Sequence, residues 1–294
     1  MEDRSFSFHA TGPVPANTDL LIGTQDSADP EIVRRADAAG PRVERIDHAG
    51  QTLWIKRANK AGRPVWLALQ RLLALLVPLD FLRPVPPTRG AAAVAREIGM
   101  IVVLREAGFR VPEIVYASSR ALVLSDLGPT LARQVVRDPG PARDEFHRGL
   151  CAAAATLARL HAVGLVHGRP SLRDFTWNGE EIGFLDFEEA PTTVMAFSPA
   201  AARDVWLLAL QVHDGTRDEA ATGAVMDHYA AAIRPDVREA LRKVLRILLP
   251  LARLLRRPCE RWGKREVRRA VGGTLALADC LDRVPATDTS APSL

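Results

Sequence analysis

The sequence predicts an α+β protein in which a region of short strands precedes a longer region of helices. Two observations lead to this fold class. Segments of alternating apolar residues lie between Val43 and Ser125, whereas apolar residues at helical spacing dominate from Asp144 onward. The chain has 294 residues, of which 47% are hydrophobic. Such a length and composition suit a compact fold with a sizeable core, built as one large domain or as two lobes.

Four short strands are predicted in the first half of the chain. Residues 43–57 alternate between apolar and polar on both sides of a glycine-containing turn, which predicts a hairpin. Residues 111–117 and 120–125 predict two further strands around a serine turn. Lys56 ends the second strand of the hairpin. Considered alone, a lysine at this position is typical of an exposed strand edge.

Helices are predicted where apolar residues recur every three or four positions. They span residues 31–40, 91–107, 144–163, 203–212 and 237–257. Glu97 lies near the start of the second helix, where the helix dipole favours an acid for purely structural reasons. Asp204 has the same ordinary explanation in the fourth helix.

The segment from Leu160 to Glu188 contains the densest group of chemical signals. A helix ends at Gly164, and a polar loop runs from His167 to Asp174. Two apolar arms then flank Asn178-Gly179, a strong hairpin signal. The second arm delivers Asp186 at its end, so the hairpin is expected to return Asp186 to the side of the polar loop.

His167-Gly168 followed by Asp174, then a hairpin, then Asp186-Phe187-Glu188 resembles the catalytic loop and metal-binding segment of the protein-kinase-like fold. The pattern is closer to the bacterial lipopolysaccharide (Kdo/heptose) kinase and small-molecule kinase branches than to eukaryotic protein kinases. The resemblance runs roughly from Val43 to Asp214. It implies a two-lobed fold with a small antiparallel-sheet N-lobe and a mainly helical C-lobe.

The domain boundaries that follow are an N-lobe over residues 31–127 and a helical C-lobe over residues 128–284. Residues 64–85 form an apolar insertion within the N-lobe. Residues 1–30 are expected to be loosely structured, and residues 285–294 are expected to be a disordered tail.

The resemblance also implies roles for individual residues in binding ATP and Mg²⁺. The strand lysine would reach the phosphates, the helix glutamate would pair with that lysine, and two aspartates would hold the metal. These residues are Lys56, Glu97, Asp174 and Asp186. Glu106 is a competing candidate for the glutamate. Backbone groups of Ser125, Asp126 and Leu127 would meet an adenine edge, Asp204 would brace the loop backbone, and His167 would have a structural role.

Arg169 departs from the family pattern, because kinases place their proton-accepting aspartate there. Arginine is always charged near neutral pH and cannot accept a substrate proton. We expect it either to face the transferred phosphoryl group or to pair with a neighbouring acid. The Gly-rich phosphate loop of the family is also not visible upstream of Lys56. Two functions therefore stay open: an ATP-dependent phosphotransferase, and a pseudokinase that binds nucleotide or a regulatory protein partner without phosphoryl transfer.

Charge is unevenly distributed along the chain. Between Arg234 and Arg269 there are 13 Lys and Arg against four Asp and Glu, so this segment carries +9 and the remainder −5. Together with the insertion at 64–85, this basic segment predicts peripheral contact with an anionic membrane surface. The insertion equally suits a helix packed on the small lobe. The acceptor would then be a sugar or a lipid-linked glycan at the inner membrane.

Other function classes lack their motifs. No Gly-x-Ser-x-Gly, Walker lysine loop, His-Glu-x-x-His or Cys-x-x-Cys occurs, and the seven histidines show no metal spacing. Low aromatic content and the absence of zinc-ligand spacing argue against nucleic-acid binding. Three widely spaced cysteines imply no disulfide framework, and no signal peptide is apparent, so a cytoplasmic location is expected.

Overall fold

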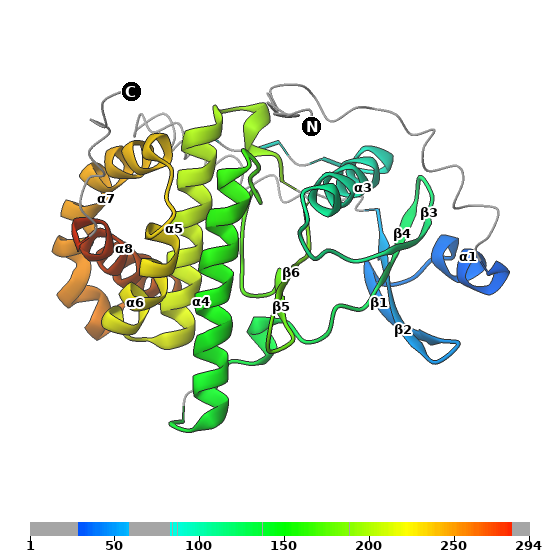
Figure 1. Cartoon of the computed structure of the whole chain (residues 1–294), viewed down its shortest axis with the longest axis horizontal. Helices are drawn as coiled ribbons and strands as arrows, with labels where there is room; N and C mark the ends of the chain where they lie inside the picture. The colour runs from blue at the N-terminus through cyan, green and yellow to red at the C-terminus, as the bar shows by residue number, and fades with distance from the viewer. Residues whose placement is uncertain are drawn as a thin grey trace, which may run out of the picture.

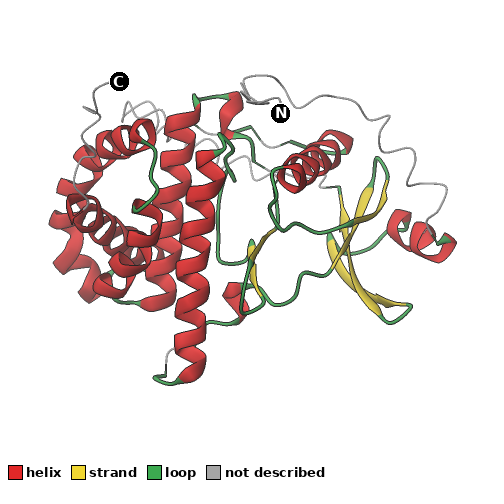
Figure 2. Cartoon of the chain, viewed as in Figure 1, coloured by secondary structure: helices red, strands yellow, loops and turns green. Residues whose placement is uncertain are grey.

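The computed structural model describes residues 29–58, 83, 85–86, 88–136, 138–187 and 189–283. Within them the protein is an α+β structure with a small antiparallel sheet and a mostly helical remainder (Figures 1 and 2). The strands are β1 (Val43–His48), β2 (Gln51–Arg57), β3 (Ile114–Ala117), β4 (Ala121–Ser125), β5 (Phe175–Trp177) and β6 (Ile182–Phe184). The helices are α1 (Pro30–Asp37), α3 (Ala91–Glu106), α4 (Pro141–Ala162), α5 (Phe197–Thr216), α6 (Glu219–Ala230), α7 (Pro235–Trp262) and α8 (Arg265–Arg283).

The four-stranded sheet has the order β1-β2-β4-β3, and every neighbouring pair is antiparallel. The predicted hairpin at 43–57 is confirmed, with a two-residue turn at Ala49-Gly50 between His48 and Gln51. Both turn residues have positive φ, at 48° and 77°, which matches the right-handed twist of the flanking strands. In this register Lys56 pairs with Val43 on one side and with Leu122 on the other, so it lies on a central strand.

The two faces of the sheet are covered by different helices (Figure 1). One face packs against α1 through a small core that includes Ile32, Leu53, Ile55 and Val123. The side chains that alternate with these, such as Leu122 and Leu124, join the main core together with α3. Because successive strand residues point to opposite faces, Lys56 is directed toward α3 and Arg57 toward α1.

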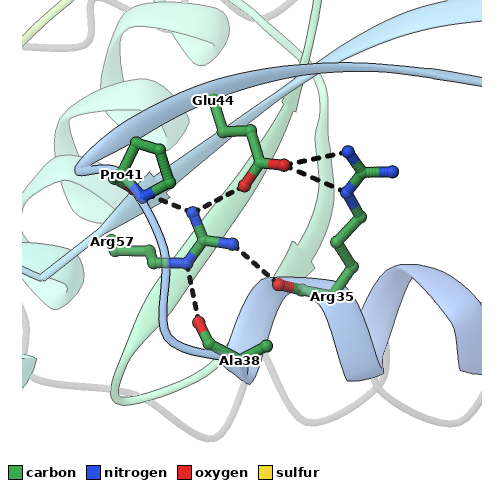
Figure 3. A network of polar contacts seen from close by, with 5 residues as sticks. All are labelled: Arg35, Ala38, Pro41, Glu44 and Arg57. Carbon is green, nitrogen blue, oxygen red and sulfur yellow. Dashed lines mark hydrogen bonds and ion pairs between the residues drawn. The ribbon is translucent and has the colours of Figure 1, made fainter.

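Arg57 ties the end of β2 to the α1 side of the sheet (Figure 3). Its guanidinium donates to the carbonyl oxygens of Arg35, Ala38 and Pro41 at 2.8, 2.9 and 2.8 Å. It also pairs with Glu44 at 2.8 Å, and Glu44 accepts a second ion pair from Arg35 at 2.9 Å. Four partners on one side chain restrain the backbone of β2 at the residue that follows Lys56.

Helices α4 and α5 lie nearest the sheet in the helical region, and α7 and α8 form the end farthest from it (Figure 1). The main core runs through α4, α5, α6 and the first half of α7. The hairpin β5–β6 lies at the junction, where it packs on α4 and pairs Phe175 with Phe184. Among the described residues, no helix has the length and apolar character needed to cross a membrane.

Three sequence predictions differ from the structure in extent. The helix expected from residue 203 begins at Phe197, so Asp204 lies well inside α5 and not in its first turn. The helix expected over residues 237–257 is α7, which continues through Pro250 and Pro258 to Trp262. Within it, Leu251 is 51% exposed. The short helix expected over 31–40 spans Pro30–Asp37.

Several predictions fall on residues outside the described part of the chain. These concern the loosely structured N-terminus up to residue 28, the tail from residue 285, and most of the insertion at 64–85. Within the insertion only Arg83 and Val85 are described. Val85 is buried, and Arg83 donates a hydrogen bond to the carbonyl of Val194 at 3.3 Å.

Candidate functional site

Lys56 lies between two carboxylates that come from distant parts of the chain. Its Nζ atom is 2.6 Å from Oε1 of Glu97 on α3 and 2.8 Å from Oδ1 of Asp186 after β6. The lysine side chain is only 16% exposed. The expected Lys56–Glu97 ion pair is therefore present, while the competing Glu106 is exposed at the end of α3. We call Lys56, Glu97 and Asp186 the Lys56 cluster.

The opposite charges in this cluster stabilise one another and so oppose the effect of burial on each pKa. Burial alone would lower the pKa of Lys56, but the adjacent Glu97 and Asp186 carboxylates raise it above its ordinary value. Burial raises the pKa of Glu97, and Lys56 only partly offsets this. For Asp186, burial also acts upward, yet Lys56 outweighs it and lowers the pKa of that carboxyl. The ammonium ion and the Asp186 carboxylate are thus both charged near neutral pH.

Asp186 is delivered to the cluster by a strained backbone. It follows β6 with φ of 64°, in the left-handed region that few residues other than glycine adopt. Aspartate tolerates this region better than most residues, but such conformations cost free energy and persist only when the surroundings hold them. The backbone next to Asp186 is held in place by a hydrogen bond from the Leu185 N–H to the Asp174 carbonyl at 2.8 Å.

Asp174 is a buried carboxylate close to Asp186. Its pKa is raised well above the ordinary value, first by burial and then by the negative charge of Asp186. The Arg169 and Lys56 charges and the Ser171 backbone act in the opposite direction but do not cancel this rise in pKa, and Asp174 is only 8% exposed. A cation between the two carboxylates would relieve this cost, and oxygen ligands of this kind suit Mg²⁺.

A complete metal cage is absent from the described residues, because no three His, Cys, Asp or Glu side chains lie close enough to hold an ion. Mg²⁺ in nucleotide sites is usually held by one or two carboxylates, with water and phosphate oxygens supplying the other ligands. Asp174 and Asp186 fit that partial donor set. Two carboxylates are too few to bind an ion without ligands from water or phosphate.

The loop that starts at His167 is braced from α5. Asp204 is fully buried and accepts hydrogen bonds from the backbone N–H groups of His167 at 2.7 Å and of Gly168 at 3.1 Å. Gly168 has φ of 104°, and a Cβ atom there would lie 2.6 Å from the carbonyl oxygen of Glu189. The loop therefore requires glycine at 168, and Asp204 makes the brace that the family resemblance implied.

His167 contacts the backbone that directly follows β6. Its ring packs among Phe175, Phe184 and Phe187, and its Nε2–H donates to the carbonyl of Leu185 at 3.1 Å. Burial lowers the pKa of this imidazole, so the ring is neutral at neutral pH. The structural role expected for His167 agrees with these contacts, since Leu185 directly precedes Asp186.

Arg169 does not stand alone in the loop. Its Nε atom lies 3.0 Å from Glu189, and the other oxygen of Glu189 lies 2.9 Å from Arg203 of α5. The Arg169 side chain is 60% exposed, whereas that of Arg203 is 11% exposed. Of the two roles expected for Arg169, the structure shows the pairing with a neighbouring acid. We call Arg169, Glu189 and Arg203 the Glu189 cluster.

The segment expected to meet adenine is largely occupied by contacts within the protein. The N–H groups of Ser125 and Asp126 donate to the carbonyls of Glu113 and Thr52 at 3.0 and 3.2 Å. The Leu127 carbonyl accepts from Arg110 at 2.9 Å. The Asp126 carbonyl and the Leu127 N–H belong to one peptide unit and point in opposite directions. One ligand edge can use only one of them.

Three residues of the site were not singled out from the sequence. Arg110 bridges the Leu127 carbonyl and the Thr176 hydroxyl at 2.9 and 3.2 Å, which links the end of the sheet to the β5–β6 hairpin. The other two are Glu189 and Arg203. The only sequence signal was a charged residue next to a predicted site element, and that signal is common on protein surfaces. Glu188, the last residue of the matching motif, lies outside the described part of the chain.

Comparison with known proteins adds little to this geometry. No protein-family model matches the chain. A Haemophilus influenzae protein described as an uncharacterized protein is 29% identical over 147 residues. The alignment covers 50% of this chain and 53% of the relative, so the chain spans about half the length of the curated protein that it matches. The similarity assigns neither a family nor an activity.

Proposed function

We propose that the protein has a protein-kinase-like fold, binds Mg·ATP at the Lys56 cluster and transfers the terminal phosphoryl group to a hydroxyl. The observation that carries the proposal is Lys56 itself. One strand lysine contacts a helix glutamate and an aspartate that follows a hairpin, at 2.6 and 2.8 Å. This combination supports phosphate binding because it holds an ammonium ion and a metal-binding carboxylate side by side.

Each residue has a part in this proposal that follows from its place. Lys56 binds the phosphates while Glu97 keeps its side chain extended along the site. Asp186, the more exposed carboxylate, and Asp174 would hold Mg²⁺. The metal, when bound, would neutralise negative charge that develops on the phosphate oxygens. The peptide unit between Asp126 and Leu127 would provide one hydrogen bond to the base.

Phosphoryl transfer breaks the bond between the γ-phosphorus and its bridging oxygen and forms a bond to the acceptor oxygen, which must lose its proton. With Arg169 paired to Glu189, we assign the proton to Asp174. Asp174 is the buried carboxylate at the end of the same loop, and without a bound cation its pKa is raised well above the ordinary value by burial and by Asp186. We propose a sugar or lipid-linked glycan as acceptor, at the inner membrane surface. The resemblance to lipopolysaccharide kinases and the local +9 between residues 234 and 269 support this.

A second candidate is a pseudokinase that binds nucleotide or a regulatory partner and transfers nothing. The observation that favours it is Arg169, which occupies the position of the usual base and neutralises the nearest acid, Glu189. Losing a general base typically lowers a rate by about 10²–10⁴-fold. The same side chains that bind nucleotide serve both candidates, so binding and transfer must be measured separately.

Binding is tested by titrating the protein with Mg·ATP in a calorimeter and by following its melting temperature. We expect saturable binding and a rise in melting temperature, because a ligand of the native state stabilises it. Asp186→Asn should weaken binding by at least about tenfold in the presence of Mg²⁺. Lys264→Met removes an exposed lysine far from the site and serves as control. Absence of binding by the native protein would reject the phosphotransferase and the nucleotide-binding form of the pseudokinase, and would leave only a module that binds a regulatory partner.

Transfer is tested with γ-labelled ATP and cell-envelope glycans as acceptors. Label that appears in the acceptor and is lost in Asp186→Asn supports the phosphotransferase. The informative variant is Arg169→Asp combined with Glu189→Gln, which restores an acid at the loop without placing it against another acid. If ATP binds but neither the native protein nor this variant transfers label, the pseudokinase is the function.

A further inference from the structure

The second half of α7 exposes a row of large apolar side chains. Ile247, Leu251, Leu254 and Trp262 are 42%, 51%, 73% and 77% exposed. Their spacing of four, three and eight residues places them on one side of the helix. Most of the large apolar side chains that are exposed in the described part of the chain occur on this segment or just after it. We call these four residues the α7 ridge.

The ridge is not the face that α7 uses for packing. The buried contacts of this half of the helix are made by Ala252 and Cys259, which pack against Val271 and Leu275 of α8. The apolar sector of α7 is thus wider than the strip that α8 covers. Both helices lie at the end of the molecule away from the sheet (Figure 1), so the ridge faces outward there.

The side of α7 next to the ridge is strongly basic. From Arg242 to Arg269 there are 11 Lys and Arg against two Asp and Glu, a net charge of +9. Some of these are satisfied within the fold: Arg256 pairs with Glu219 at 3.1 Å and Arg265 pairs with Asp214. By contrast, Arg253 and Arg257 form no ion pair with any described acid, and both are exposed.

Part of this basic side borders a hollow between α7 and α8. The hollow is lined by Arg242, Arg246, Arg253 and Asp282, together with apolar side chains that include Leu249 and Leu281. Three guanidinium groups against one carboxylate leave a positive site. Guanidinium forks suit phosphate oxygens, and an apolar floor suits the hydrocarbon beside a lipid headgroup.

We propose that the α7 ridge and its basic flank dock the protein on an anionic lipid bilayer, with α7 lying in the plane of the interface. The ridge enters the region between headgroups and acyl chains, and the arginines contact lipid phosphates. Charge complementarity selects this occupant over a second copy of the chain. Two copies joined through this face would bring two segments of +9 together, which is unfavourable.

This proposal is independent of the nucleotide site, because none of the ridge or hollow residues belongs to the Lys56 or Glu189 cluster. It would place the helical end of the molecule on the membrane. Vesicle binding is therefore measured without nucleotide, so that a failure to bind ATP and a failure to bind lipid are distinguishable.

The test is co-sedimentation of the full chain with phosphatidylcholine vesicles that contain or lack phosphatidylglycerol. We expect binding to the anionic vesicles, weak binding to the neutral ones, and release at high salt, where the Debye length falls to about 3 Å. Arg253→Ala/Arg257→Ala should weaken partitioning about 30-fold, since each basic group near an anionic surface contributes ~1 kcal/mol. Leu251→Ser/Leu254→Ser should weaken it on both vesicle types.

Matched controls change the same chemistry elsewhere. Arg34→Ala/Arg120→Ala removes two exposed arginines from the sheet region, and Val102→Ser/Val163→Ser removes two exposed apolar side chains. Both controls should bind like the native protein. Equal binding to neutral and anionic vesicles, or control variants that lose as much as the α7 variants, would overturn the proposal. So would the absence of vesicle binding together with a dimer that dissociates in Leu251→Ser/Leu254→Ser.

Discussion

Two clusters of three charged side chains flank the loop from His167 to Asp174, and their charges are arranged in opposite senses. In one, a cation lies between two acids; in the other, an acid lies between two cations. The first consists of Lys56, Glu97 and Asp186, and the second of Glu189, Arg169 and Arg203. The first has a net negative charge with one carboxylate partly exposed, whereas the second has a net positive charge with one guanidinium mostly exposed.

The difference lies in how far each cluster is shielded from water. The Lys56 cluster is largely buried, so each charge depends on its partners and the geometry is held tightly. The Glu189 cluster opens toward solvent at Arg169, which can therefore change with little cost to the fold. The two clusters are separate groups of side chains, so variants can change one while leaving the other in place.

The largest effect is expected from Lys56→Met. Removing one partner of a buried ion pair leaves the other charge without compensation and typically costs about 3–5 kcal/mol. Replacing Glu97 as well, in Lys56→Met/Glu97→Leu, should restore much of that loss. The free energy of unfolding, measured with urea, checks both variants against Lys264→Met. A loss in Lys56→Met no greater than in the control would show that the buried pair is not what stabilises this part of the sheet.

An intermediate effect is expected from Asp174→Asn, and it depends on pH. The native state raises the pKa of the Asp174 carboxyl, chiefly through burial, so it keeps its proton to a higher pH than the unfolded chain does. Stability contributed by this proton is present below the unfolded pKa of about 3.9 and is lost as pH rises through the folded value. Asparagine does not titrate. The melting temperature of the Asp174→Asn variant should therefore equal that of the native protein in acid and exceed it near neutral pH.

The measurement is a series of melting curves without nucleotide or metal, from about pH 4 to about pH 8. Each kcal/mol corresponds to roughly 2–4 °C in a domain of this size. Asp138→Asn changes an exposed carboxyl and serves as the control. If the difference in melting temperature between Asp174→Asn and the native protein is the same at every pH, the pKa of Asp174 is not raised in the folded state.

The smallest effect is expected from Arg169→Ala. Its side chain is 60% exposed, and Glu189 keeps its second partner, Arg203, at 2.9 Å. Exposed ion pairs contribute about 0–1 kcal/mol, so the free energy of unfolding should fall by less than that. Glu189→Gln should lower the free energy of unfolding by more, because it leaves the largely buried Arg203 without its carboxylate partner. The reverse order in urea unfolding would mean that Arg169 is the residue that holds this part of the loop together.

Local patterns in the sequence were sufficient for the elements that carry the site. Period-two alternation and the Asn-Gly signal predicted both hairpins, at 43–57 and around Asn178, and the structure confirms them. Helical spacing predicted α1, α3, α4, α5 and α7 but missed α6 and α8. It placed the start of α3 correctly at Ala91 and that of α5 six residues too late. Glu189 and Arg110 were not predicted as site residues, because a single charged residue beside a loop is common on protein surfaces.

The sequence by itself determined the order of the strands and of five of the described helices, the turn that returns Asp186 to the loop, and the concentration of basic residues after Arg234. Only the tertiary structure decided which charges meet. Lys56 contacts acids 41 and 130 positions away, and Arg169 is paired with Glu189 and not left facing the site. Likewise, packing by α8 decided which part of the apolar sector of α7 is buried and left Leu251 exposed. The physical reason is that backbone periodicity is local, whereas burial and ion pairing depend on distances that are set only when remote segments pack together.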